Sequence, residues 1–155
     1  MIDLYDEFRR LVATLERESI EYALCGGLAM AVHGSPRATI DIDLLIEADS
    51  LDRLIEIAKE LGYTIRGTDL QFADGAIEIR RISKIEPTSG DLLSLDLLLV
   101  TPNILSAWES RIVANWEDGK LWVVSRAGLI KLKSLRGSGQ DLDDIEKLRE
   151  RSPNG

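Results

Sequence analysis

Cysteine and positive charge are both scarce in this chain of 155 residues. Cys25 is the single cysteine, so no intrachain disulfide can form, and we expect a reducing, cytoplasmic location. The 19 basic residues against 27 acidic ones leave a net charge of -8, which excludes a broadly basic surface that coats nucleic acid. The net charge does not exclude a local basic patch that binds one nucleotide or one end of a nucleic acid.

Long hydrophobic runs are absent as well. No apolar run approaches the roughly 20 residues that a membrane-spanning helix needs, so we expect no contact with a membrane. The charged first residues, MIDLYDEFRR, are unlike a signal peptide. The length and the ordinary share of hydrophobic residues, 45%, predict a single globular domain over residues 1–155.

Hydrophobic periodicity predicts an alternation of helices and strands along the chain. Helices are expected at residues 3–18, 28–33, 50–61, 102–113, 125–136 and 141–149. Strands are expected at residues 20–25, 40–47, 63–66, 76–82, 93–100 and 120–124. The polar Pro/Gly loop between residues 76–82 and 93–100 predicts an antiparallel hairpin. We therefore expect an α/β or α+β domain, a mixed twisted sheet flanked by helices, with a core at 20–124 and C-terminal helices at 125–150.

Two acidic residues on one predicted strand are the first functional candidates. Strand side chains alternate between faces, so Asp41 and Asp43 point the same way, about 6.6 Å apart along the strand. Two neighbouring carboxylates repel each other, and a cation between them would remove that penalty. Hard oxygen ligands suit Mg²⁺ or Mn²⁺. A bare Asp-x-Asp pair is also compatible with a strand that has one solvated face.

Two further features favour a metal site. Asp96 lies within an otherwise apolar strand pattern, where an acid needs a partner, and it is a natural third carboxylate. Gly26 and Gly27 end one strand and precede a helix, where backbone N–H groups can approach a phosphate. The alternatives are an exposed edge-strand acid and a plain tight turn. The 13 residues between the glycines and Asp41 leave room for a helix and a returning strand.

These residues together resemble the nucleotidyltransferase superfamily of the DNA polymerase β type. The superfamily pattern is a Gly-Gly or Gly-Ser turn, a helix, an Asp-x-Asp strand and a later third Asp. The stretch from Pro36 to Asp43 is similar to the minimal, single-domain bacterial and archaeal members, including the AbiEii-like toxin relatives. Leu129-Ile130-Lys131-Leu132-Lys133 and Asp141-Leu142-Asp143-Asp144-Ile145 are similar to two later family segments.

The resemblance implies a role for each matching residue. Asp41, Asp43 and Asp96 would be the catalytic, metal-binding carboxylates, with Mg²⁺ or Mn²⁺ as cofactor. Gly26 and Gly27 would cradle the nucleotide triphosphate, and Lys133 would reach its phosphates. Arg37 is a candidate either to steer a phosphate or to balance the charge of the acid pair. The chain departs from the family at Gln140, where relatives often carry a basic residue, and Arg136 is the candidate substitute.

The expected function is metal-dependent transfer of a nucleoside monophosphate from an NTP to an acceptor, with release of pyrophosphate. The acceptor is open between a tRNA end, a protein and a small hydroxylated molecule. A domain this small has little room for an acceptor-binding domain, so a protein partner or a homodimer is expected to supply part of the site. The alternative is a non-catalytic, nucleotide- or partner-binding member of the fold, for example within a toxin–antitoxin pair.

Overall fold

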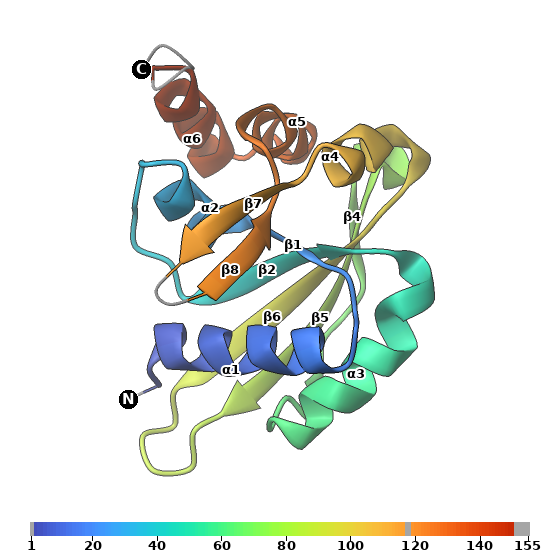
Figure 1. Ribbon diagram of the computed structural model, residues 1–155, viewed down its shortest axis with the longest axis vertical. Helices are drawn as coiled ribbons and strands as arrows, with labels where there is room; N and C mark the ends of the chain where they lie inside the picture. Colours follow the sequence, from blue (N-terminus) through green and yellow to red (C-terminus); the bar gives the residue numbers. More distant parts are fainter. Residues whose placement is uncertain (1, 117–118, 151–155) are drawn as a thin grey trace.

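The computed structural model describes residues 2–116 and 119–150, which form one mixed sheet flanked by helices (Figure 1). The helices are α1 (Leu4–Arg17), α2 (Gly26–Val32), α3 (Leu51–Glu60), α4 (Leu105–Glu109), α5 (Arg126–Arg136) and α6 (Gly139–Glu150). The strands are β1 (Ala23–Cys25), β2 (Asp41–Ile46), β3 (Ile65–Arg66), β4 (Leu70–Phe72), β5 (Ile77–Ile85), β6 (Leu92–Leu99), β7 (Ile112–Trp116) and β8 (Gly119–Val123). This is the α+β fold class that the sequence predicts.

The sheet runs in the order β3-β5-β6-β2-β1-β8-β7, with β4 paired to β5 outside that path. β2 and β6 are parallel neighbours near the middle of the sheet, and their register places Asp43 opposite Asp96. β5 and β6 pair antiparallel, as the sequence predicts for this hairpin. The two strands that carry the candidate acids are therefore adjacent, although about fifty residues separate them in the chain.

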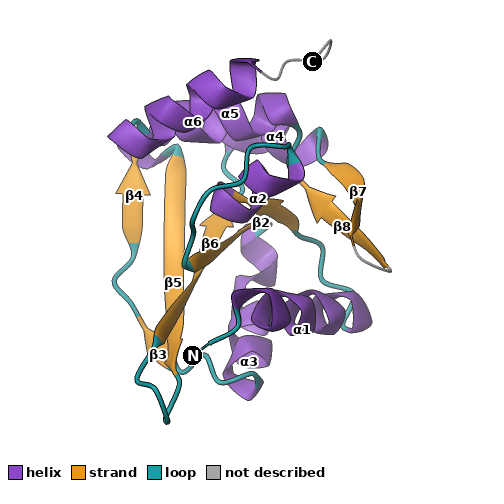
Figure 2. Ribbon diagram, turned by 90° about the vertical axis from the view of Figure 1, so that its left-hand side faces the viewer, coloured by secondary structure: helices purple, strands orange, loops and turns teal. Residues whose placement is uncertain are grey.

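Helices cover the sheet from two sides, as Figures 1 and 2 show. α1 and α3 pack beside each other on one side, and α2, α4, α5 and α6 group together on the other. Leu11 and Leu15 of α1, Leu54 of α3, and Leu44 and Ile46 of β2 are fully buried in one hydrophobic core. Each such side chain contributes about 1.5–3 kcal/mol to folding, which holds β2 firmly beneath the acids it carries.

The C-terminal helices follow the predicted boundaries closely. The Ser125 hydroxyl accepts a hydrogen bond from the Gly128 backbone N–H at 3.0 Å and caps the start of α5. Gly137 ends α5 with a φ of +67°, a left-handed conformation that suits glycine. α6 follows directly, so the chain folds back and the two helices pack together.

The helix predicted at residues 102–113 is wrong beyond Glu109. A short helical turn and α4 end there, and Ile112–Trp116 instead form strand β7, in which Val113 pairs with Trp122. The β-branched pair Ile112-Val113 favours an extended chain, and pairing with β8 decides the outcome. β4 was not predicted either, and it pairs with β5 at the margin of the sheet.

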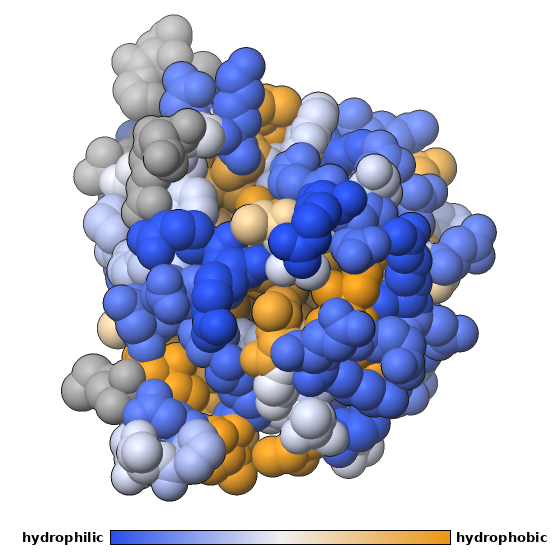
Figure 3. Space-filling view, turned by 60° about the horizontal axis from the view of Figure 1, so that its bottom comes forward, coloured by the Kyte–Doolittle hydropathy of each residue, from blue (hydrophilic) through white to orange (hydrophobic). Residues whose placement is uncertain are grey.

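The surface agrees with the mixed composition. Hydrophilic side chains cover most of the face shown in Figure 3, and hydrophobic residues appear there as separate patches. Across residues 2–116 and 119–150, the structure contains no helix long and apolar enough to cross a membrane.

Candidate functional site

The three candidate acids lie together on one face of the central strands. Asp41 and Asp43 are two residues apart on β2, and Asp96 is the register partner of Asp43 on β6. Asp43 is 8% exposed and Asp96 is 4% exposed, whereas Asp41 is only partly buried. Two nearly buried carboxylates thus lie side by side, with a third one closer to solvent.

Burial and mutual repulsion perturb the charge of these acids. Burial and then the Asp96 carboxylate raise the pKa of Asp43 to about 7, with a smaller contribution from Asp41, while the charges of Arg136 and Lys133 act in the opposite direction. Burial and the Asp96 charge also raise the pKa of Asp41. In the part of the chain that the structure describes, no hydrogen bond or ion pair engages the Asp43 carboxylate. Asp43 is therefore a buried acid whose negative charge lacks a directly bonded cation.

The Gly26-Gly27 turn touches the acid strand. Gly26 has a φ of +67°, and a Cβ atom there would overlap the Asp43 carboxylate, so only glycine fits this position without displacement. A Cβ atom on Gly27 would lie 2.7 Å from the Thr39 hydroxyl oxygen and 3.4 Å from an Arg37 guanidinium nitrogen. The turn and the acids therefore form one continuous region of the molecule.

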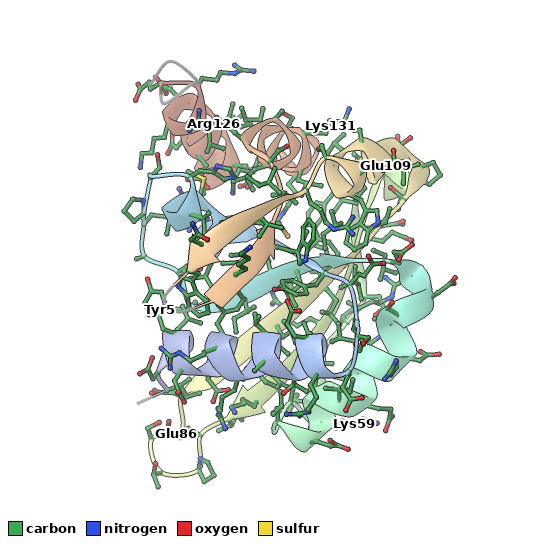
Figure 4. The ribbon with its side chains drawn as sticks, in the orientation of Figure 1. Tyr5, Lys59, Glu86, Glu109, Arg126 and Lys131 are labelled. Atoms are coloured by element: carbon green, nitrogen blue, oxygen red, sulfur yellow. The ribbon has the colours of Figure 1, made fainter. Side chains whose placement is uncertain are left out.

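Lys133 lies in a buried ionic cluster with Asp144. Its ammonium nitrogen is 2.9 Å from an Asp144 oxygen and 3.6 Å from an Asp141 oxygen. Lys133 is 4% exposed, whereas Lys131 lies at the outer surface of α5 (Figure 4). Lys133 is thus the inward-facing lysine of this helix, and it joins α5 to α6.

Arg37 bonds Asp144 rather than the acid pair. Its Nε donates to both Asp144 oxygens at 3.1 Å, from the loop that leads into β2. Gln140 donates to the same carboxylate at 2.9 Å. Burial raises the pKa of Asp144, but the hydrogen bonds and charges of Lys133, Gln140 and Arg37 outweigh it, and the net pKa is lowered. Asp144 is consequently a well-compensated anion.

Arg136, at the end of α5, acts on the acids through its charge. Its charge lowers the pKa of both Asp41 and Asp43, and its guanidinium lies 5.4 Å from the Phe72 ring centre. A cavity of about 20 Å³, large enough for one water-sized group, lies here. It is lined by Cys25, Gly26, Asp43, Leu98, Leu129, Leu132, Lys133, Arg136 and Asp141.

Arg81 is the residue of this site that the sequence analysis missed. It lies on β5 opposite Asp96, and its guanidinium donates to both carboxylate oxygens, at 2.7 Å and 2.9 Å. A basic residue on the strand predicted to pair with that of Asp96 was the available signal. Using this signal required the hairpin register, which depends on the loop between β5 and β6.

Cys25 and His33 have structural positions near the turn. Burial raises the pKa of the Cys25 thiol well above its usual range, which keeps the group neutral. His33 Nε2 lies 2.8 Å from the Val124 backbone oxygen and ties the end of α2 to the chain after β8. Both positions are structural: a neutral buried thiol and a contact between two chain segments.

The donor chemistry of the acid face fits a hard divalent cation. Asp41 and Asp43 offer carboxylate oxygens, and the raised pKa of Asp43 reflects negative charge that such a cation would stabilise. Among residues 2–116 and 119–150, however, no three His, Cys, Asp or Glu side chains are gathered closely enough to hold a metal ion. The Arg81 guanidinium holds the third carboxylate, Asp96.

A known family matches more than half of this chain. The family model described as "Nucleotidyl transferase AbiEii toxin, Type IV TA system" matches residues 9–97. The matched segment includes the Gly-Gly turn, the acid pair on β2, Arg81 and Asp96. No curated protein sequence matches the chain.

Solved structures with low sequence identity share the fold. The lincosamide antibiotic adenylyltransferase LnuA, with lincomycin bound, has a TM-score of 0.62 and 19% identity, and the match covers 95% of this chain and 97% of that one. ANT(2'')-Ia, in complex with adenylyl-2''-tobramycin, has a TM-score of 0.65 and 12% identity, covering 95% and 88%. JHP933 from Helicobacter pylori has a TM-score of 0.59 and 16% identity, covering 96% and 65%.

Proposed function

We propose that this chain, which belongs to the AbiEii nucleotidyl transferase family, transfers a nucleoside monophosphate from a nucleoside triphosphate to an acceptor hydroxyl in a metal-dependent reaction. The observation that carries the proposal is the acid face itself. Asp41, Asp43 and Asp96 lie on adjacent strands, and the Gly26-Gly27 turn touches the same strand. A buried carboxylate without a bonded cation, as at Asp43, is costly for folding, so its place beside two further acids favours a role in binding cations.

Asp41 and Asp43, joined by Asp96, would hold Mg²⁺ or Mn²⁺ through their carboxylate oxygens. A bound divalent cation neutralises phosphate charge and so lowers the barrier to phosphoryl transfer. Asp41 is partly exposed and would be the acid most accessible to a substrate, whereas Asp43 and Asp96 are buried. The rigid core beneath β2 would keep these ligands in place during the reaction.

Gly26, Gly27 and the nearby cations would bind the nucleotide. The two glycines let the turn pack directly against Asp43 and Thr39, and its backbone N–H groups at the start of α2 would bind the phosphate oxygens. Arg136 presents its charge to the same region from α5. Arg37 and Lys133 are anchored on Asp144, so they would contribute positive potential from fixed positions.

The transfer step follows from this arrangement. The acceptor oxygen attacks the α-phosphorus, the bond to the bridging oxygen of the β-phosphate breaks, and pyrophosphate leaves. Asp96, beside Asp43, would accept the proton from the attacking hydroxyl. The acid face and the glycine turn act mainly by positioning the two reactants, which is the usual contribution of a protein to this chemistry.

The acceptor is proposed to be a hydroxyl group of a tRNA end, a protein or a small molecule. The solved structures of LnuA with lincomycin and of ANT(2'')-Ia with adenylyl-2''-tobramycin support small hydroxylated acceptors on this fold. The family description, a toxin of a type IV toxin–antitoxin system, supports a macromolecular acceptor and a partner protein. The assay must therefore offer all three acceptor classes.

Incubation with each α-labelled NTP, Mg²⁺ and the acceptor panel tests the proposal. Wild type is expected to transfer label to one class, and Asp41→Ala and Asp43→Ala to lose about 10³-fold or more of that rate. Equal rates in wild type and both variants would refute catalysis at this face. Tight Mg²⁺-NTP binding by calorimetry without transfer to any acceptor would favour the non-catalytic, nucleotide-binding alternative.

A further inference from the structure

Arg81 occupies both oxygens of the third carboxylate. Its Nε and Nη2 atoms form a two-point contact with Asp96, the geometry in which a guanidinium binds a carboxylate most strongly. Asp96 is 4% exposed, so few other groups can reach it. Asp96 is therefore the register partner of Asp43, but its carboxylate is bonded to Arg81 of β5.

The Arg81–Asp96 contact hinders binding of one metal ion by all three carboxylates. A carboxylate has further lone pairs, but a divalent cation on Asp96 would then lie within a few ångström of the Arg81 charge. Two like charges on one carboxylate repel strongly in a partly buried setting. The guanidinium and a metal ion thus compete for Asp96, in agreement with the lack of any gathered metal-ligand trio in the described chain.

The Arg81 side chain has room to leave. It is 39% exposed, whereas the side chain of Asp96 is 5% exposed. Gly67 packs against the stem of Arg81, where a Cβ atom would lie only 3.2 Å from the Arg81 Cβ and Cγ, so the stem is held in place while the exposed guanidinium end is free to turn. A guanidinium that leaves Asp96 reaches solvent on the same face of the sheet from which substrate would enter.

We propose that Arg81 is a latch on the metal site. Without nucleotide, the Arg81 guanidinium bonds Asp96 and so prevents Asp96 from binding a divalent cation. When the triphosphate binds, the guanidinium bonds the phosphates instead, and Asp96 becomes available as a metal ligand. The inference rests on the proposed function, since it assumes that the acids bind metal. Guanidinium binds phosphate with the same two-point geometry as carboxylate, so the exchange replaces one strong contact by another.

Mn²⁺ alone is the probe for the first experiment, titrated by calorimetry into the metal-free, full-length protein. Arg81→Ala is expected to bind Mn²⁺ at least about fivefold more tightly than wild type, because the competing cation is gone. A merely structural role for Arg81 would instead weaken the binding. Arg81→Lys is a second variant, for use if the alanine variant folds poorly. Lysine cannot bond both carboxylate oxygens as the guanidinium does, so Arg81→Lys should give a smaller gain in Mn²⁺ affinity.

Arg80→Ala is the matched control. Arg80 is the next residue on β5, its side chain lies on the other face of the strand, and it pairs with Asp69 at 3.4 Å. Its removal changes the net charge by the same amount without touching Asp96. Arg80→Ala is therefore expected to bind Mn²⁺ as wild type does, which separates the local contact from a general charge effect.

A non-hydrolysable NTP analogue provides the second arm. In wild type the analogue is expected to tighten Mn²⁺ binding by a larger factor than in Arg81→Ala, where no latch has to open. Unchanged or weaker Mn²⁺ binding in both Arg81 variants would overturn the latch and leave metal-dependent transfer standing. If no variant binds Mn²⁺, with or without the analogue, the latch and the proposed function fall together.

Discussion

Asp43 and Asp144 are both buried carboxylates near Lys133, yet their charges are compensated very differently. Asp144 bonds Lys133, Arg37 and Gln140, and these contacts lower its pKa. Asp43 has Cys25 and Asp96 as its partners on the two adjacent strands, neither of them a cation, and its pKa is raised to about 7. The pKa of Asp144 is below the ordinary value and that of Asp43 is above it, because Asp144 is bonded to cationic side chains and Asp43 is not.

This difference in charge compensation distinguishes a structural ion-pair cluster at Asp144 from a candidate binding site at Asp43. Asp144 ties α5, α6 and the loop before β2 together, so its contacts act in the folded protein without any ligand. Asp43 costs folding free energy until a cation arrives, which is the usual state of a site prepared for a ligand. The predictions below test this contrast, first by substitution and then by pH.

Asp144→Ala is expected to destabilise the protein by about 4 kcal/mol, because it leaves the buried Lys133 with only the longer contact to Asp141. Urea denaturation of the metal-free protein measures the loss. Asp143→Ala is the control, since Asp143 is an exposed acid on the same helix and should change stability by no more than about 0.5 kcal/mol. Similar losses in the two variants would refute the structural role of Asp144.

Gly26→Ala is expected to cost about 3 kcal/mol, from the left-handed backbone and from overlap of the new methyl group with the Asp43 carboxylate. Gly90→Ala is the matched control: Gly90 also has a positive φ, +77°, but nothing within 4 Å of its Cβ position. The difference between the two free energies of unfolding isolates the contact with Asp43. An equal loss in both variants would show that the turn does not press on the acid.

Local periodicity was sufficient to predict that Asp41 and Asp43 share one face of a strand. Alternation along one strand places Asp41 and Asp43 together, and the later Asp96 in an apolar run needs a partner. The Arg81 contact was out of reach, because it depends on pairing across a hairpin whose register is decided by the residues between the strands. Long-range register is a property of the whole sheet, so a single segment carries little information about it.

The Lys133 cluster shows a different limit. The family resemblance implied that Lys133 reaches substrate phosphates, and it gave no role to the acids of the last helix. The structure bonds them to each other, since Asp141 and Asp144 are three residues apart on one face of α6 and meet Lys133 across the helix pair. The three-residue spacing of Asp141 and Asp144 is visible in the sequence. Which face of each helix is buried, however, is decided by the packing of α5 on α6.

The metal-free protein is expected to lose stability as the pH rises from about 4 to about 7. The folded state keeps a proton on Asp43 up to a pKa of about 7, whereas the unfolded chain releases it near the ordinary value of 3.8. The folded state binds more protons in this window, so each pH unit costs up to about 1.4 kcal/mol. Asp144, with a lowered pKa, acts in the opposite direction and below that window. Urea denaturation in EDTA at pH 5, 6, 7 and 8 measures the slope, and Asp43→Asn, which cannot ionise, should flatten it. If the slope survives in Asp43→Asn, Asp43 is not the uncompensated charge, and the contrast with Asp144 loses its basis.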